Sequence, residues 1–264
     1  MNFNENIITI PVDVTNPGQF FACCGLLELA DRVYQGAEGW FEEDKFCVKL
    51  SNHNPIIPEK LFNALINCDV QTDRNATDAA VAPVMLGSPI NMRLDWWLKS
   101  NGTPSLFKTW SGNGGSLKSF LKWHKQAENC VSEVADDLSN IFNVKTKVQG
   151  SYSFDIRGAW VASEVGFSPN AHSAYQKLML YPFVEILGAI GLQRCLPCLD
   201  VKSRVIEFST WNVPVPPIVA QVAVVGALPM IVSEKLQSNF VSRGSCKGLG
   251  IARIVKGESY DDEN

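Results

Sequence analysis

The chain has 264 residues, of which 46% are hydrophobic and 19% are charged, and its formal net charge is −4 at pH 7. This composition excludes disorder over most of the chain and allows a sizeable core, in one large domain or two closely packed ones. The negative net charge argues against a protein that coats DNA by bulk electrostatics, because such proteins carry a strong positive excess.

The beginning of the chain, residues 1–5, lacks the charged region and long apolar run of a signal peptide. No later stretch approaches the roughly 20 uninterrupted apolar residues of a membrane span. The eight cysteines are scattered, which suits a reducing compartment better than a disulfide framework. We therefore expect a cytoplasmic protein with free thiols.

The first predicted elements are a strand at 7–14, at a sheet edge or bulge because it contains a proline, and then a helix. Thr15 or Asn16 can cap this helix, Pro17 suits its first turn, and apolar residues recur at helical spacing as far as Gly36. It is the best-specified element of the chain.

Strands on both sides of the acidic turn at 42–45 and an amphipathic helix at 58–68 complete a predicted β-α-β-β-α order. Residues 69–88 have weak periodicity and many small or polar side chains, which indicates a loop region that binding could order. Two further strands, at 90–98 and 106–110, flank an Asn-Gly turn signal at 101–102.

Ser116 is expected to cap a helix that runs to about Cys130. Its apolar positions predict a core-facing side, and three lysines at spacings of four and three predict a solvent-facing basic stripe. The core positions are Leu117, Phe120, Leu121 and Trp123, and the stripe is Lys118, Lys122 and Lys125.

The second half of the chain begins with a polar linker at 140–150. The elements predicted after it are a helix at 181–192, a strand at 201–211, a proline-started helix at 216–226 and a terminal hairpin of 236–243 with 249–255.

The predicted fold class is α+β, with mixed or antiparallel sheets, packed helices and two closely associated lobes. The expected division is an N-terminal lobe at 1–145, a C-terminal lobe at 146–256 and a disordered acidic tail at 257–264. No repeat of fixed period is present, which argues against a solenoid or propeller.

Charge is distributed unevenly along the chain. Residues 1–80 hold twelve acidic and five basic side chains, whereas 85–130 hold six basic and two acidic ones. A second segment, 235–256, has five basic residues and no acidic one. A local basic face is therefore compatible with net acidity.

A glycine-rich loop joins the predicted hairpin to the helix that Ser116 caps, and its sequence KTWSGNGGS spans 108–116. It places Lys108, Trp110 and three glycines before a helix start, where free N–H groups and the helix dipole favour a phosphate. The Gly-x-x-Gly spacing also occurs in nucleic-acid-clamping loops, but no Gly-Lys-Ser/Thr follows, so a nucleotide-hydrolysing P-loop is excluded. A flexible connection without a ligand remains an equally good interpretation.

The segment SRGSCKG at 242–248 is a second basic turn, in which glycines allow close approach to a sugar-phosphate backbone. A tight hairpin connection with solvated charges would have the same sequence.

Catalytic and metal-binding patterns are weak. Cys195 and Cys198 have the spacing of half a zinc site, but no second half accompanies them, and buried or incidental thiols are favoured. The three histidines have no nucleophile signature beside them and the Gly-x-Ser-x-Gly elbow is absent. Asp95, and Asp155 with Arg157, are expected to be ion-pair partners. We therefore expect neither enzymatic activity nor a cofactor or metal.

Several segments together resemble the large-subunit-like proteins of the subtype I-U (also called I-G) CRISPR systems. They are IPVDVTNPGQFFACCGLLELA at 10–30, LDWW at 94–97, KTWSG at 108–112, DIR at 155–157, VGFSPN at 165–170, AIGLQR at 189–194, STW at 209–211, the prolines of 214–217 and SRG at 242–244. The resemblance spans nearly the whole chain.

The resemblance implies a non-catalytic subunit of a type I Cascade ribonucleoprotein, in which guide RNA reads the target and protein reads a short flanking motif or holds displaced DNA. Its partners would be guide RNA, target DNA, other Cascade subunits and a recruited helicase-nuclease. The alternative is a scaffold subunit without nucleic-acid contact. Candidate nucleic-acid-binding residues are Lys108, Trp110, Gly112, Asn113, Gly114, Ser116, Lys118, Lys122, Arg157, Arg243 and Lys247.

Overall fold

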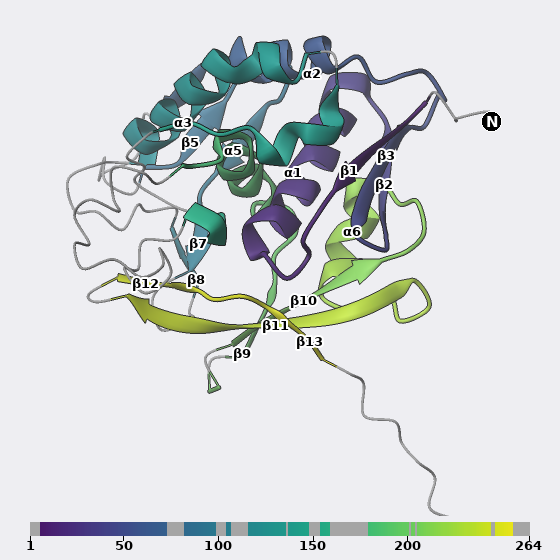
Figure 1. Ribbon diagram of the computed structural model, residues 1–264, viewed down its shortest axis with the longest axis vertical. Coiled ribbons are helices and arrows are strands. Elements are labelled where there is room, and N and C mark those ends of the chain that lie inside the picture. The colour runs from purple at the N-terminus through teal and green to yellow at the C-terminus, as the bar shows by residue number, and fades with distance from the viewer. Residues whose placement is uncertain are drawn as a thin grey trace, which may run out of the picture.

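Two helices from opposite halves of the chain lie side by side at the centre of the molecule (Figure 1). They are α1 (Pro17–Tyr34) and α5 (Pro182–Gly191), and both begin with a proline in the first turn. The computed structural model describes residues 6–72, 82–98, 104–106, 116–135, 137–147, 154–158, 179–200, 202–203, 205–243 and 246–255.

The start of α1 is set as its sequence predicts. The side chain of Asn16 caps the helix, because its Oδ1 accepts a hydrogen bond from Gly18 N at 3.1 Å. The helix ends at Tyr34 and is followed by Gln35, a left-handed C-cap residue with φ of 58°. All residues from Pro17 to Ala30 are buried, so α1 is surrounded by other elements over most of its length.

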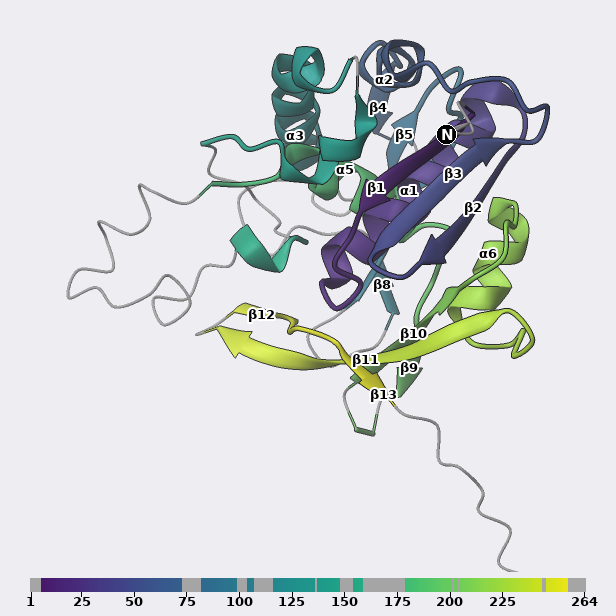
Figure 2. The ribbon, with the colours of Figure 1, turned by 45° about the vertical axis from the view of Figure 1, so that its right-hand side comes forward.

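One face of α1 is covered by a three-stranded antiparallel sheet in the order β1-β3-β2 (Figure 2). Its strands are β1 (Ile7–Pro11), β2 (Ala37–Glu42) and β3 (Lys45–Leu50). Aromatic rings fill the space between this sheet, α1 and the C-terminal half: Phe41 lies 5.3 Å from Phe20 and 4.9 Å from Trp211, centroid to centroid. The predicted strand and hairpin are confirmed here.

The predicted loop at 69–88 is wrong for the residues that the structure describes. It contains β4 (Val70–Thr72) and β5 (Val84–Leu86), which form an antiparallel sheet with β6 (Met92–Leu94) in the order β4-β5-β6. Strands of three residues are too short to show periodicity, and they are stabilised by pairing with each other.

The predicted strand at 90–98 is divided between two sheets, because β7 (Trp96–Leu98) pairs with β8 (Pro104–Leu106) rather than continuing β6. At the division, the backbone N–H groups of Asp95 and Trp96 both donate to Gln193 Oε1, at 3.0 and 2.9 Å. The second strand of this hairpin begins earlier than the predicted 106–110, and the turn at 101–102 lies outside the described residues.

Two further helices, α2 (Pro58–Ile66) and α3 (Ser116–Cys130), agree with their predicted positions. The short 3-10 helices are η1 (Val131–Glu133), η2 (Leu138–Asn143) and η3 (Ile156–Gly158). The predicted polar linker at 140–150 is wrong at its start: Ile141 and Phe142 of η2 and Val144 directly after it are buried, and η2 packs against β1 and α5.

The C-terminal sheet has the order β12-β11-β10-β9, with β13 also paired to β11. Its strands are β9 (Cys198–Asp200), β10 (Val205–Trp211), β11 (Val232–Arg243), β12 (Cys246–Leu249) and β13 (Arg253–Val255), and α6 (Pro217–Val224) connects β10 to β11. The predicted terminal hairpin is present, but its first strand begins four residues earlier, because β11 also pairs with β10. The predicted second strand at 249–255 is divided: β12 begins at Cys246 and ends at Leu249, and β13 pairs with β11 further along.

Helices packed on antiparallel sheets make this an α+β fold, as predicted. A continuous hydrophobic core includes residues of both halves, from Ile10 to Ala252. The division into lobes at 145 and 146 stays a prediction, and the acidic tail at 257–264 lies outside the described residues.

Candidate nucleic-acid interface

The outer face of α3 carries three basic side chains. Lys118 and Lys125 are exposed and Lys122 is half-buried, whereas Phe120 and Trp123 on the inner face are fully buried. Lys125 pairs with Glu128 at 2.8 Å, an exposed contact that contributes little to stability. Lys118 and Lys122 have no ion pair with the described residues, so their charge is available to a ligand.

One predicted core position of α3 is wrong. Leu121 is 41% exposed, whereas Ala127 and Cys130, further along the helix, are buried. The buried side follows Phe120, Trp123 and Ala127 at spacings of three and four, and Leu121 lies beyond its edge.

The glycine-rich loop lies outside the described residues, which resume at Ser116 as the first residue of α3. Lys108, Trp110, Gly112, Asn113 and Gly114 therefore stay candidates from sequence alone. The described start of α3 agrees with the expectation that the loop leads directly into a helix.

The second basic turn is the end of the β11–β12 hairpin. Its register places Arg243 opposite Cys246 and Ser242 opposite Lys247, so the two basic residues lie at or next to the last described pair. The binding role of Arg243 and Lys247 stays a prediction.

Arg157 has a different environment from the other basic candidates. Its guanidinium donates to both carboxylate oxygens of Asp155, with the shortest contact at 2.6 Å, and to the backbone oxygen of Phe142 at 2.6 Å. It also donates to Asn143 Oδ1 at 3.0 Å and lies 3.7 Å from the centroid of the Tyr181 ring. The ion pair expected for Asp155 is therefore observed, and a phosphate would have to compete with these contacts.

Asp155 belongs to a buried polar cluster that the sequence did not reveal. Its Oδ1 accepts from Asn16 Nδ2 at 2.8 Å, and the backbone N–H groups of Phe154 and Asp155 donate to Glu185, at 2.8 and 3.0 Å. Burial raises the pKa of Glu185 well above its usual range, and these two N–H groups oppose the increase. The cluster links the start of α1 to α5 and provides hydrogen-bond acceptors for the backbone N–H groups of Phe154 and Asp155. Its role is therefore structural.

A second buried carboxylate, Glu28 of α1, accepts from Arg32 at 2.6 Å and from Arg194 at 3.0 Å through the same oxygen. Arg32 also donates to the backbone oxygens of Ile90 and Asn91, which attaches the segment before β6 to α1. The signal for both clusters was a glutamate inside an apolar helix, as at Glu28 and Glu185. Because burying a carboxylate without partners is costly, a glutamate at such a position predicts hydrogen-bond or ion-pair partners around it.

Asp95 and His124, two titratable residues in the described part of the chain, both have partners inside the molecule. Asp95 pairs with Arg93 at 2.7 Å, as expected, and a ring nitrogen of His124 contacts Leu65 O at 3.0 Å. Within the described part of the chain, no group of three or more His, Cys, Asp or Glu side chains could hold a metal ion.

The seven cysteines whose side chains are described are all free, which confirms the expectation for them. Cys195 is buried and Cys198 is exposed, so the two thiols of this motif lie in different environments. Burial raises the pKa of Cys23 and Cys24 well above the usual value, which keeps these thiols protonated at neutral pH.

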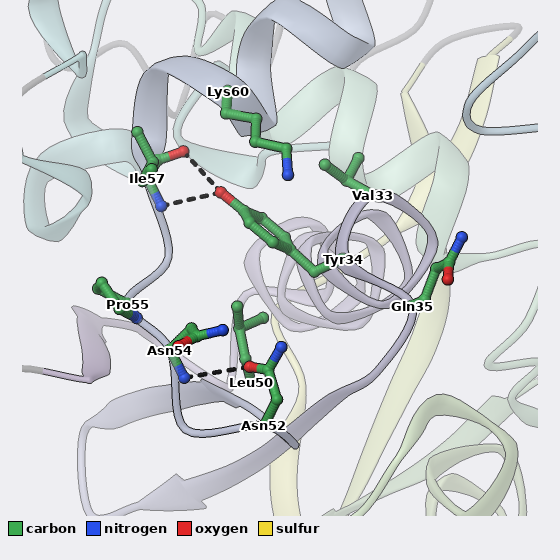
Figure 3. Close-up of a pocket in the computed structure, with 9 residues that line it drawn as sticks. All are labelled: Val33, Tyr34, Gln35, Leu50, Asn52, Asn54, Pro55, Ile57 and Lys60. Carbon is green, nitrogen blue, oxygen red and sulfur yellow. Dashed lines mark hydrogen bonds between the residues drawn. The ribbon is translucent and has the colours of Figure 1, made fainter.

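A cavity of about 570 Å³ opens between the end of α1 and the segment that leads into α2 (Figure 3). The Tyr34 hydroxyl accepts from Ile57 N at 2.9 Å and donates to Ile57 O at 3.1 Å, and Lys60 Nζ lies 4.4 Å from the Tyr34 ring centroid. Burial raises the pKa of Tyr34. The lining has amides, the Tyr34 phenol and the Lys60 ammonium, and no carboxylate or thiol.

Comparison of the chain with protein-family models, with curated proteins and with solved structures found no match. Among the helices in the described residues, none combines the length and apolar character that crossing a membrane requires. The function must therefore be argued from the residues themselves.

Proposed function

We propose that the chain is a non-catalytic subunit of a type I CRISPR Cascade ribonucleoprotein, which contacts target DNA, the end of the guide RNA or both. The observation that carries the proposal is the pair of outward lysines on α3, Lys118 and Lys122, which lack ion-pair partners among the described residues. The resemblance of the sequence to the large-subunit-like proteins of subtype I-U indicates which kind of complex the chain would belong to.

In this proposal the lysines of α3 and Lys108 neutralise phosphates. The backbone N–H groups of Gly112, Gly114 and Ser116 face a phosphate at the helix start, and Trp110 or Asn113 approaches a base or the flanking-motif duplex. Arg243 and Lys247 provide a second phosphate contact. Sequence is read mainly by guide RNA pairing, and cleavage is left to a recruited helicase-nuclease.

The test is charge reversal on α3 in the assembled complex. Lys118→Glu with Lys122→Glu should weaken target-DNA binding about tenfold or more, and should reduce the slope of log K against log salt by about 2, since each phosphate contact contributes about 0.9. Gel-shift titrations at several salt concentrations measure both quantities.

The matched control is Lys45→Glu with Lys202→Glu, which makes the same change of charge at two exposed lysines on β3 and before β10. It should leave the salt slope unchanged. Equal affinity and slope for the α3 variant and the unmodified complex would reject the proposed interface.

The net charge of −4 favours a second candidate, a scaffold subunit that docks other subunits and does not contact nucleic acid. Under this alternative, the α3 variant enters the complex normally and the complex binds target DNA with unchanged salt dependence. Failure of the unmodified chain to co-purify with neighbouring gene products and a guide RNA would reject both candidates.

A further inference from the structure

Two arginines from opposite halves of the chain share the buried carboxylate of Glu28. Arg32 Nε, on α1, donates to Glu28 Oε1 at 2.6 Å, and Arg194 Nε, shortly after the end of α5, donates to the same oxygen at 3.0 Å. The Glu28 side chain is 2% exposed, that of Arg32 23% and that of Arg194 40%. The two guanidinium groups are therefore neighbours, and that of Arg194 reaches the surface.

The two arginines are held in different ways. Arg32 also donates through Nη1 to two backbone oxygens, whereas Arg194 contacts the described residues through Nε alone. Glu28 Oε2 is buried and accepts no hydrogen bond from any described group, so the carboxylate does not hold Arg194 in a bidentate pair. The two terminal nitrogens of Arg194 are therefore available to an oxyanion, which accepts parallel hydrogen bonds from such a fork.

The charges in this group do not cancel, because two guanidinium groups contact one carboxylate. The nearest other carboxylates have different partners: Asp95 pairs with Arg93 at 2.7 Å, and Asp31 accepts from Ala37 N at 3.1 Å. One cation is sufficient to pair with Glu28, and Arg32 supplies it from the same helix. The half-exposed charge of Arg194 therefore remains for a ligand.

Gln193 connects this site to the strand pair that leads to the glycine-rich loop. Its Oε1 accepts from the N–H groups of Asp95 and Trp96, and its Nε2 donates to Trp96 O at 3.3 Å. Trp96 is the cross-strand partner of Leu106, the last described residue before the loop. Cross-strand partners lie about 5 Å apart. Arg194 is therefore close to the point where the chain enters the loop.

We propose that Arg194 binds a backbone phosphate of the nucleic acid that the glycine-rich loop contacts, and that Glu28 holds its guanidinium in place. The inference rests on the proposed function and adds a contact at a site away from α3. A guanidinium already oriented by one ion pair loses less conformational freedom when its remaining donors bind a phosphate. The contact is to the backbone, so it positions the strand and does not read its sequence.

The test is a titration of the full chain with a fluorescent single-stranded oligonucleotide of about 12 nucleotides, measured by anisotropy at several salt concentrations. Arg194→Gln should weaken binding at least about threefold and should reduce the slope of log K against log salt by about 0.7, the contribution of one phosphate on a single strand. A purely structural role would change the melting temperature and leave this slope unaltered.

The matched control is Arg253→Gln on β13, which removes another exposed arginine with one side-chain hydrogen bond, to Gln237 Oε1 at 2.7 Å. It should leave affinity and slope unchanged. If Arg194→Gln fails to fold, the same titration is made with Arg194→Lys. That variant keeps the charge and the ion pair but not the fork, so it should weaken binding with little change of slope.

The charge-reversed α3 variant, measured in parallel, separates the two proposals. If it binds more weakly while Arg194→Gln, or Arg194→Lys in its place, equals the unmodified chain, the phosphate contact of Arg194 is overturned and the α3 interface stands. An unmodified chain that binds no oligonucleotide also overturns the contact, and the α3 interface is then decided in the assembled complex.

Inorganic phosphate, compared with chloride at equal ionic strength, distinguishes a strand from a small ion as the ligand. We expect both salts to weaken oligonucleotide binding equally, because the phosphate that Arg194 binds is part of the strand. Specific displacement by inorganic phosphate, lost in Arg194→Gln, would identify a small phosphate ion as the ligand and overturn the contact with the strand.

Discussion

Arg157 is the basic residue with the most contacts among the described candidates. It holds Asp155 in a bidentate pair, reaches η2 through Phe142 and Asn143, and stacks on Tyr181 before α5. A guanidinium suits this place because its donors are arranged in a planar fork, whereas a lysine would supply only one point charge. We therefore expect stabilisation of the fold to be the main role of Arg157, and nucleic-acid binding a secondary one.

Replacing Arg157 by alanine should lower the free energy of unfolding by about 3 kcal/mol, because Asp155 would be buried without its cation. The measurement is urea denaturation followed by circular dichroism. The control, Lys125→Ala, removes an exposed ion pair and should cost less than about 1 kcal/mol. Equal midpoints for the two variants, or lost DNA binding by a fully stable Arg157→Lys variant, would contradict the structural role.

At the scale of elements, the contact between α1 and α5 depends on glycines. A Cβ atom at Gly25 would lie 1.9 Å from Leu187 O, and one at Gly191 would lie 1.9 Å from Phe21 O. These are backbone atoms that cannot move aside, so the two helices approach this closely only without side chains. At Gly188, in the same contact, the nearest atom would be 3.5 Å away, an ordinary van der Waals distance.

Gly25→Ala should therefore reduce stability by about 2 to 3 kcal/mol, since the clash separates the helices despite the better helix propensity of alanine. Gly188→Ala should be neutral or gain up to about 1 kcal/mol, because it has the propensity gain without the clash. Thermal unfolding of both variants measures the difference. Similar melting temperatures would show that α1 and α5 are not held at this distance.

At the scale of the whole molecule, the core crosses the predicted lobe boundary. Phe20 of α1 lies 4.5 Å from Phe208 of β10, centroid to centroid, and Trp211 Nε1 donates to Gly39 O of β2 at 2.7 Å. The strands β2 and β10 also contact each other, and Gly39 and Val215 form an isolated bridge. The two halves therefore complete one another's packing.

A fragment of residues 1–145 should lack cooperative thermal unfolding, because α1 would lose α5 and β10 as partners. The full chain should show one transition, and co-expression with 146–264 should restore it. Circular dichroism and calorimetry measure these transitions. A fragment that unfolds cooperatively by itself would support two independent lobes.

Local sequence was sufficient for the elements that carry their own signals. The cap and proline at Asn16 and Pro17 predicted the start of α1, because capping acts within a few residues. The periodicity after Ser116 predicted the position of α3, in which Ser116 is the first residue, and its role as a cap stays a prediction. The outward lysines of α3 followed from the same spacing. The glycine-rich loop lies outside the described residues, so its binding role remains an inference from sequence.

Tertiary structure alone decided the features whose stability comes from distant residues. Three-residue strands such as β4 and β5 form because they pair, and Ile141 is buried because η2 meets β1. Arg157 was a candidate phosphate-binding residue from sequence. In the structure it contacts Asp155, Phe142 and Tyr181, two of which lie on other segments of the chain. Short-range patterns specify local hydrogen bonding, whereas burial and ion pairing depend on which surfaces the completed fold brings together.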